Sequence, residues 1–310
     1  MIDLTYAPDL VEEAVLLAER TMPGDTFRGF RRERNAVYAI ADPERRDAAF
    51  REAHLRWFVR LSLHRPVEEA IEERAELTGR VAQVRVLRAL RRQEEAADLF
   101  DRAPTDAAGR RQPLLALRLR PSLLLDAEPL RALLRHELMH VADMLDPAFG
   151  YERRLPPSDD GPSADNIVRD RYRVLWDVTI DGRLARAGWA HPDARAARCR
   201  EFAATFSMLG ERASQTFGEW FDRIVPTHQA MAAFAITPPG PLGDGRDGGT
   251  GRCPLCRFPV ASLDRHPERL TAAARSLIER EYPSWSIDRG LCPQCLDLYE
   301  AQHVSHNCAS

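Results

Sequence analysis

The most informative stretch of the chain reads Leu133-Leu134-Arg135-His136-Glu137-Leu138-Met139-His140. Its two histidines are four residues apart, so on a helix they lie one turn apart on the same face and can bind one metal ion. Glu137 lies about 100° further around such a helix and can reach a water molecule on that metal. A metal lowers the pKa of its bound water, and a nearby carboxylate can then accept the proton. The stretch therefore predicts a zinc peptidase with ligands His136 and His140 and the general base Glu137.

The sequence around this HExxH motif predicts that it lies on a helix next to a sheet. Apolar residues recur there at helical spacing, and Asp126 and Glu128 flank a helix start before Pro129. The segment Leu123–Leu125 is interpreted as a short buried strand. Residues 113–120 alternate leucine with alanine and arginine, which is typical of a half-buried strand. We therefore expect strands to lead into the HExxH helix.

The rest of the chain indicates an α+β protein that is mainly helical. Strand-like alternation recurs at residues 81–90, where a helix is the alternative, and loops are expected at 102–109 and 146–165. Apolar spacing predicts helices over 8–20, 44–63, 66–77, 164–187, 194–209, 211–224, 227–236 and 267–281. We expect a zincin-like domain with a small antiparallel or mixed sheet over residues 1–237, a flexible Gly-rich and Pro-rich linker over 238–251, and a zinc-ribbon domain over 252–310.

Composition narrows the function classes. The formal net charge of the 310 residues is −3, so nothing requires a nucleic acid or an anionic membrane as partner. All 44 basic residues are arginine, which excludes lysine-based covalent catalysis and, with abundant alanine and proline, indicates a GC-rich bacterial genome. No apolar run approaches the length of a membrane span, and the start lacks the features of a signal peptide. We therefore expect a cytoplasmic protein whose six cysteines are thiols or metal ligands, not disulfides.

A catalytic zinc ion needs a third protein ligand. The next histidine after His140 is His191, so acidic residues on the expected helix 164–187 are the better candidates. Asp177 and Asp181 lie one turn apart there, and one can bind the metal while the other holds a ligating imidazole by its second nitrogen. The alternative is that both aspartates pair on a solvated face with Arg173, Arg183 or Arg186.

An HExxH motif followed by an acidic pair on a later helix resembles the gluzincin metallopeptidases. The resemblance covers about residues 110–190 and implies that Asp177 is the third zinc ligand and that Asp181 supports a motif histidine. Gluzincins carry a glutamate at the ligand position, where this chain has the shorter Asp177, so Asp181 and Glu201 stay open as third ligands. Asp143, two turns after His136, is expected to support a ligand rather than to bind metal itself.

A hydrogen-bond donor must also stabilise the oxyanion that develops during peptide hydrolysis. In such sites the donor is usually a tyrosine, a histidine or an arginine. The candidates are Tyr172, Tyr151, His191 and His228, and the alternative for each is an ordinary core or surface residue. Tyr172, on the same expected helix as Asp177, is the one that we assign to catalysis.

A pair of CxxC motifs near the end of the chain predicts a second metal site. Cys253 and Cys256 form the first motif, and Cys292 and Cys295 form the second. Two such turns can place four thiolates tetrahedrally around one zinc ion, and a site filled by four cysteines is closed and structural. We expect so short a module to need its metal for folding.

Two functions from different classes follow. The first is a zinc metallopeptidase with one catalytic and one structural zinc ion, acting on a peptide or protein. The second is a non-catalytic metal-binding protein whose ribbon contacts a protein or a nucleic acid. An HExxH domain followed by a cysteine ribbon is also similar to the SprT-like proteases, which act near DNA, but a third histidine close to the motif is missing here. The ribbon carries no basic stripe, which favours a protein contact or a stabilising role over nucleic acid.

Overall fold

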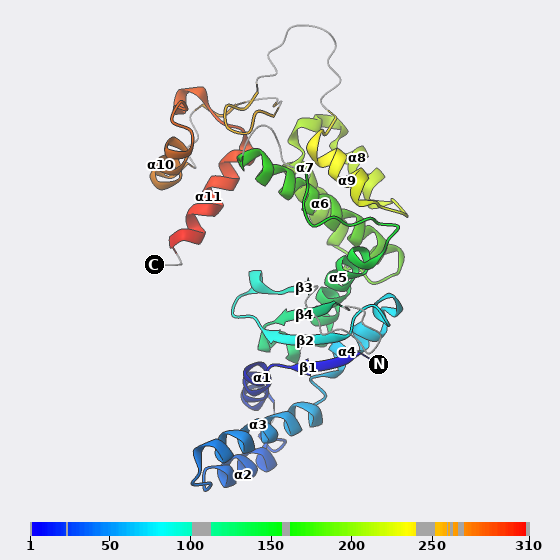
Figure 1. The fold of residues 1–310 in the computed structure, drawn as a ribbon, viewed down its shortest axis with the longest axis vertical. Coiled ribbons are helices and arrows are strands. Elements are labelled where there is room, and N and C mark those ends of the chain that lie inside the picture. Colours follow the sequence, from blue (N-terminus) through cyan, green and yellow to red (C-terminus); the bar gives the residue numbers. More distant parts are fainter. Residues whose placement is uncertain are drawn as a thin grey trace. The chain divides into compact units, whose positions relative to one another are not determined.

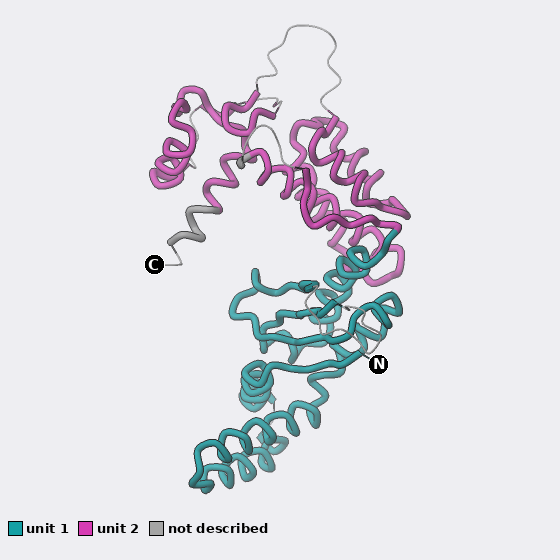
Figure 2. The backbone as a smooth tube through the Cα atoms, in the orientation of Figure 1, with its two compact units in different colours: residues 1–147 teal, residues 148–310 magenta. Residues whose placement is uncertain are grey.

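A computed structural model describes residues 2–22, 24–100, 113–156, 162–239, 252–258, 260, 263–265 and 270–307 (Figure 1). The chain forms two compact units, residues 1–147 and 148–310 (Figure 2). The loop expected at 102–109 and most of the linker expected at 238–251 lie outside the described residues. No helix within the described ranges combines the length and the apolar content needed to cross a membrane.

Unit 1 is built on a four-stranded mixed sheet. The strands β1 (Asp3–Tyr6), β2 (Gln83–Arg88), β3 (Ala96–Phe100) and β4 (Leu114–Leu119) lie in the order β1-β2-β4-β3. The pairs β1–β2 and β2–β4 are parallel, whereas β3 pairs with β4 in the antiparallel sense. Sheet and helices together confirm the α+β prediction and its mixed-sheet variant.

Five α-helices accompany this sheet. They are α1 (Pro8–Thr21), α2 (Arg28–Val37), α3 (Pro43–Arg60), α4 (Arg65–Glu72) and α5 (Ala127–Leu145). Helix α5 carries the HExxH motif and buries Leu130, Leu134, Leu138 and Val141 in the core that the sheet residues share. Their spacing of four, four and three residues places all four on one face of a helix, which explains why α5 packs along the sheet.

One predicted element of unit 1 is wrong. Leu123–Leu125 is not a strand but part of the 3₁₀ helix η3 (Pro121–Leu125), which leads directly into α5. Pro121 occupies its first turn, where the fixed φ of proline suits a helix and the missing N–H costs nothing. Only Leu124 of the three leucines is fully buried, so a short 3₁₀ helix is enough to bury the apolar part of this segment.

The first part of unit 2 is helical, as its apolar spacing predicted. It contains α6 (Pro162–Arg186), α7 (Ala194–Thr205), α8 (Ala213–Phe221) and α9 (His228–Ile236). Helix α6 contacts each of the other three. At Gly182 the backbone of α6 approaches α8 so closely that an added Cβ would lie 1.7 Å from the carbonyl oxygen of Phe221. Glycine is therefore required at this crossing.

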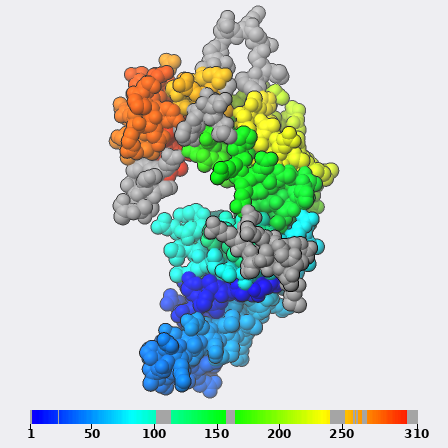
Figure 3. Space-filling model, viewed as in Figure 1, coloured from blue at the N-terminus to red at the C-terminus, as the bar shows by residue number. Residues whose placement is uncertain are grey.

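The second part of unit 2 is the cysteine module, by which we mean the described residues between 252 and 307. It contains α10 (Ala272–Glu281) and α11 (Pro293–Asn307), and an isolated bridge joins Asp264 to Leu291. Its apolar core surrounds the four cysteines and also includes Ile167 of α6. The space-filling view shows α10 and its neighbours as a closely packed orange body (Figure 3). The module is thus packed on the longest helix of its own unit.

Candidate metal centres

The two histidines of the HExxH motif face each other on α5. Their Nε2 atoms lie 3.3 Å apart. Two zinc–nitrogen bonds of 2.0–2.1 Å at a tetrahedral angle place the nitrogens about 3.3 Å apart. The pair therefore has a spacing at which both imidazoles could bind one metal ion.

The orientation of this pair follows from the helix that carries it. At about 100° per residue, the leucine face of α5 is directed away from His136 and His140, and Glu137 falls between the two directions. Both histidines and Glu137 are only partly buried, whereas Leu134 and Leu138 are fully buried. Burial of the leucine face thus presents the histidines at the surface of unit 1. Asp143, expected to support a ligand, is buried on the same helix.

Glu137 is held by the edge strand of the sheet. The backbone amide of Ala97 in β3 donates a hydrogen bond of 3.1 Å to Oε2 of Glu137. This amide is directed away from β4, because β3 is the last strand in the sheet order. Sequence reasoning missed the contact, since it did not recognise β3 as a strand.

The HExxH helix is also fixed by an ion pair with the end of α4. Arg135 donates two hydrogen bonds to Glu73, from Nε at 2.8 Å and from Nη2 at 2.6 Å. These hydrogen bonds lower the pKa of Glu73, with burial acting in the opposite sense. A two-pronged bond of this kind restricts rotation of the helix as well as its position. Arg135 precedes His136 directly, so the restriction acts on the metal-binding turn.

Asp177, the predicted third ligand, lies buried on α6 in unit 2. Its Oδ2 accepts a hydrogen bond of 3.0 Å from Nη1 of Arg173 and one of 3.1 Å from Nη1 of Arg198. The alternative of arginine pairing was therefore right about Arg173. It was wrong about the solvated face, because Asp177 is buried. Arg186 instead donates to the carbonyl oxygens of Phe221 and Arg223.

Arg198 joins the three acidic residues considered as ligands. Besides Asp177, it donates to Oδ2 of Asp181 at 2.7 Å and to Oε2 of Glu201 at 2.6 Å. Burial by itself lowers the pKa of Arg198, but Asp181 and Asp177 outweigh that effect and raise it. Sequence reasoning missed Arg198; its only local signal was Glu201 three residues later on the same helix.

Three of the four oxyanion candidates gather in one aromatic cluster of unit 2. The hydroxyl of Tyr172 lies 2.6 Å from Nδ1 of His228, and Tyr151 packs edge-on against the same imidazole. Burial lowers the pKa of His228, which favours its neutral form. The fourth candidate, His191, is an exposed residue beside Asp193.

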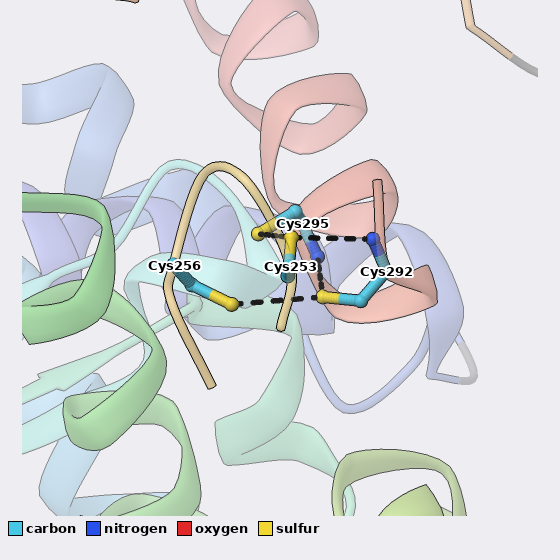
Figure 4. Close-up of side chains that lie close together, drawn as sticks. All are labelled: Cys253, Cys256, Cys292 and Cys295. Atoms are coloured by element: carbon cyan, nitrogen blue, oxygen red, sulfur yellow. Dashed lines mark hydrogen bonds between the residues drawn. The ribbon is translucent and has the colours of Figure 1, made fainter. Parts of the chain in front are cut away.

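The four predicted cysteines converge in the cysteine module (Figure 4). Their sulfurs all lie within 4.8 Å of one another, with Cys253 to Cys295 and Cys256 to Cys292 both at 3.8 Å. A tetrahedral site with zinc–sulfur bonds of 2.3 Å has sulfurs about 3.8 Å apart. All four side chains are buried and none forms a disulfide. This cluster could hold a metal ion.

Backbone amides complete the surroundings of the sulfurs. The amide of Cys292 donates to Sγ of Cys253, and the amide of Cys295 donates to Sγ of Cys292, both at 3.4 Å. Hydrogen bonds from Cys256, Cys292 and Cys295 lower the pKa of Cys253, whereas the hydrogen bond with Cys253 raises that of Cys256. The cluster therefore favours negative charge on part of its sulfurs even without metal, and a cation would complete the ionisation.

No family model, curated protein or solved structure matches this chain. The functional assignment therefore depends on the geometry of its own residues.

Proposed function

We propose that the protein is a zinc-dependent metallopeptidase that hydrolyses peptide bonds. The observation that carries this proposal is the 3.3 Å spacing of the His136 and His140 Nε2 atoms beside a carboxylate, Glu137, fixed by the edge strand. Two imidazoles on one helical face, next to a carboxylate of their own helix, are the donor set of a metal site that activates water.

Asp177 is the third ligand in this proposal. Two imidazoles and one carboxylate suit zinc and leave a fourth position open for water or substrate. The hydrogen bonds from Arg173 and Arg198 to Oδ2 fix the carboxylate of Asp177 in one orientation, as partners of a ligand usually do. Asp181 and Glu201 are the substitutes if Asp177 fails the test.

Each remaining residue has a defined role. Zinc in this site would acidify a bound water and polarise the substrate carbonyl. Glu137 takes the proton of the attacking water, and the amide of Ala97 keeps its carboxylate in place. Tyr172 is the proposed donor to the oxyanion, because its phenol is oriented by the hydrogen bond with His228.

The cysteine cluster is the structural zinc site of the same protein. Its support is the match between the 3.8 Å sulfur separations and a tetrahedral zinc–thiolate centre. With all four positions filled by cysteine, this centre offers no place for substrate, so it stabilises the module and takes no part in hydrolysis.

Metal stoichiometry tests the proposal. Purified wild-type protein should contain two zinc ions per chain, His136→Ala one, and the double variant Cys253→Ser, Cys256→Ser one. A library of peptides then tests hydrolysis by the wild type and by His136→Ala. One zinc ion in the wild type that persists in His136→Ala but disappears in the cysteine variant would refute the catalytic site. It would leave the non-catalytic metal-binding function.

A further inference from the structure

Arg171 is a fully buried arginine at the junction of α6 and the cysteine module. Its side chain has no exposed surface. The guanidinium lies over the ring of Phe258, 4.3 Å from the ring centroid, and Nη2 donates a hydrogen bond of 3.1 Å to Oε1 of Gln294. Both partners belong to the cysteine module: Phe258 follows the first CxxC motif, and Gln294 lies inside the second.

Among the residues that the structure describes, no carboxylate pairs with the guanidinium of Arg171. Within the described ranges, its Nε and Nη1 atoms lack any hydrogen-bond partner. The adjacent Asp170 bonds instead to Arg173. Burial lowers the pKa of Arg171 to about 10, so the guanidinium still carries its charge at neutral pH. A buried charge without a counter-charge strongly destabilises the folded state, so a group of opposite charge is expected near Arg171.

The cysteine cluster is a source of negative charge beside both partners of Arg171, since Phe258 lies two residues after Cys256 and Gln294 lies between Cys292 and Cys295. Burial lowers the pKa of Arg171, and the negative charge of Cys256, Cys292 and Cys295 opposes this change. One divalent cation bound by four thiolates leaves a net charge of about −2 in the centre of the module. We propose that Arg171 is the counter-ion of this metal–thiolate centre, so that metal binding and docking of the cysteine module on α6 are coupled.

This coupling rests on the proposed metal site at the four cysteines. With metal bound, the dianionic centre and the guanidinium attract each other across a buried, low-dielectric junction. Without metal the cluster lacks the charge of the loaded dianionic centre, and Arg171 is left as a buried charge with less compensation. Arg171 should therefore stabilise the loaded protein and destabilise the metal-free one, a change of sign that a purely structural side chain would not show.

The test compares Arg171→Met with Arg169→Met, an exposed arginine on the same helix. Cobalt(II) serves as the probe, since its thiolate absorption reports on the cysteine site alone, in competition with a chelator of known affinity. We expect Arg171→Met to weaken cobalt binding about 10- to 100-fold, the usual loss when a partner of a metal ligand is removed. Arg169→Met should bind like wild type. In urea unfolding, Arg171→Met should be less stable than wild type with metal but at least as stable without it.

Two further variants separate the explanations. Arg171→Lys keeps the positive charge and should keep most of the cobalt affinity. This variant still tests the proposal if Arg171→Met fails to fold. In the Cys253→Ser, Cys256→Ser background, Arg171→Met should no longer lower stability. Equal cobalt affinity of wild type and Arg171→Met, or equal losses for Arg171→Lys and Arg171→Met, would overturn the counter-ion role. Failure of the wild type itself to give the thiolate absorption would instead refute the metal site on which the inference rests.

Discussion

The backbone amide of Ala97 and the carboxylate of Glu137 are joined by a hydrogen bond of 3.1 Å. Through it, the sheet of unit 1 holds the proposed general base against the edge strand. The bond uses one carboxylate oxygen, Oε2, and an amide oxygen at the same place could accept it equally well. This relationship determines how the base can be removed without disturbing the fold.

Glu137→Gln should therefore keep the metal and lose hydrolysis. The amide side chain preserves the bond to Ala97, and both histidines are untouched, but the group can no longer accept a proton. General-base catalysis contributes about 10²- to 10⁴-fold, so kcat should fall by that factor. Zinc content and peptide turnover are measured on the same preparation. Hydrolysis that Glu137→Gln leaves unchanged would remove the base from the mechanism.

Arg198→Met should destabilise unit 2. The substitution leaves Asp177 and Asp181 buried with fewer partners, and breaking a buried ion-pair network typically costs about 3–5 kcal/mol. Because the Arg198 side chain retains 18% exposure, we expect the lower end of that range. The control is Arg195→Met on the same helix, whose more exposed pair with Asp222 should contribute less than about 1 kcal/mol. Urea unfolding of the metal-free proteins gives both values, and equal losses would contradict the prediction.

Gly182→Ala should destabilise the helical part of unit 2, whereas Gly218→Ala should not. An added methyl at Gly182 collides with the Phe221 carbonyl, and forcing atoms into a packed crossing costs about 1–3 kcal/mol or more. The same change at Gly218, on α8, meets nothing within 4 Å and should stabilise by about 0.5–1 kcal/mol. Thermal unfolding monitored by circular dichroism distinguishes the two.

His54 should make stability fall at acidic pH. It is buried on α3 with its ring against Phe30 of α2, its Nε2 has no hydrogen-bond partner among the described residues, and burial lowers its pKa below 6.5. The unfolded state therefore binds a proton more readily than the native state. The stabilising contribution is complete above about pH 6.5 and is lost as the pH falls below that value.

His54→Phe should reduce this loss, because phenylalanine does not titrate and suits a site beside Phe30 and Phe50. Urea unfolding at pH 7.5 and at pH 5.5 gives the stability difference for each protein. His191→Gln, a change at an exposed histidine, should behave like wild type. A wild-type difference that His54→Phe retains in full would assign the acid sensitivity to other groups.

Local patterns explain what the sequence could predict. The helices α1 and α3 and the strands β2 and β4 have strong apolar periodicity, and their positions were close to those observed. The strands β1 and β3 and the helix α2 were not foreseen. β1 has only four residues and is half-buried, and β3 depends on pairing with β4, a contact that no local pattern encodes.

The candidate sites show the same contrast between features that local patterns predict and features that depend on long-range contacts. The helical repeat alone relates His136 to His140, and the repeated CxxC motif alone relates the four cysteines. The partners of these groups come from other elements: Ala97 from a strand 40 residues earlier, and Gln294, which binds Arg171, from 123 residues later. Arginine is so frequent in this chain that Arg171 and Arg198 could not be distinguished from surface residues before the fold was known.

Helix α6 fixes the relative positions of two sites in unit 2, the contact of Arg171 with the cysteine module and the ion pairs of Asp177. Arg171 and Asp177 are six residues apart on one unbroken helix, about 9 Å along its axis and about 120° around it. Inserting or deleting one residue between them would turn one side chain by about 100° relative to the other, so both could no longer meet their partners. Insertions and deletions between these residues should therefore be far less tolerated than substitutions. Selection should preserve the spacing between the two residues.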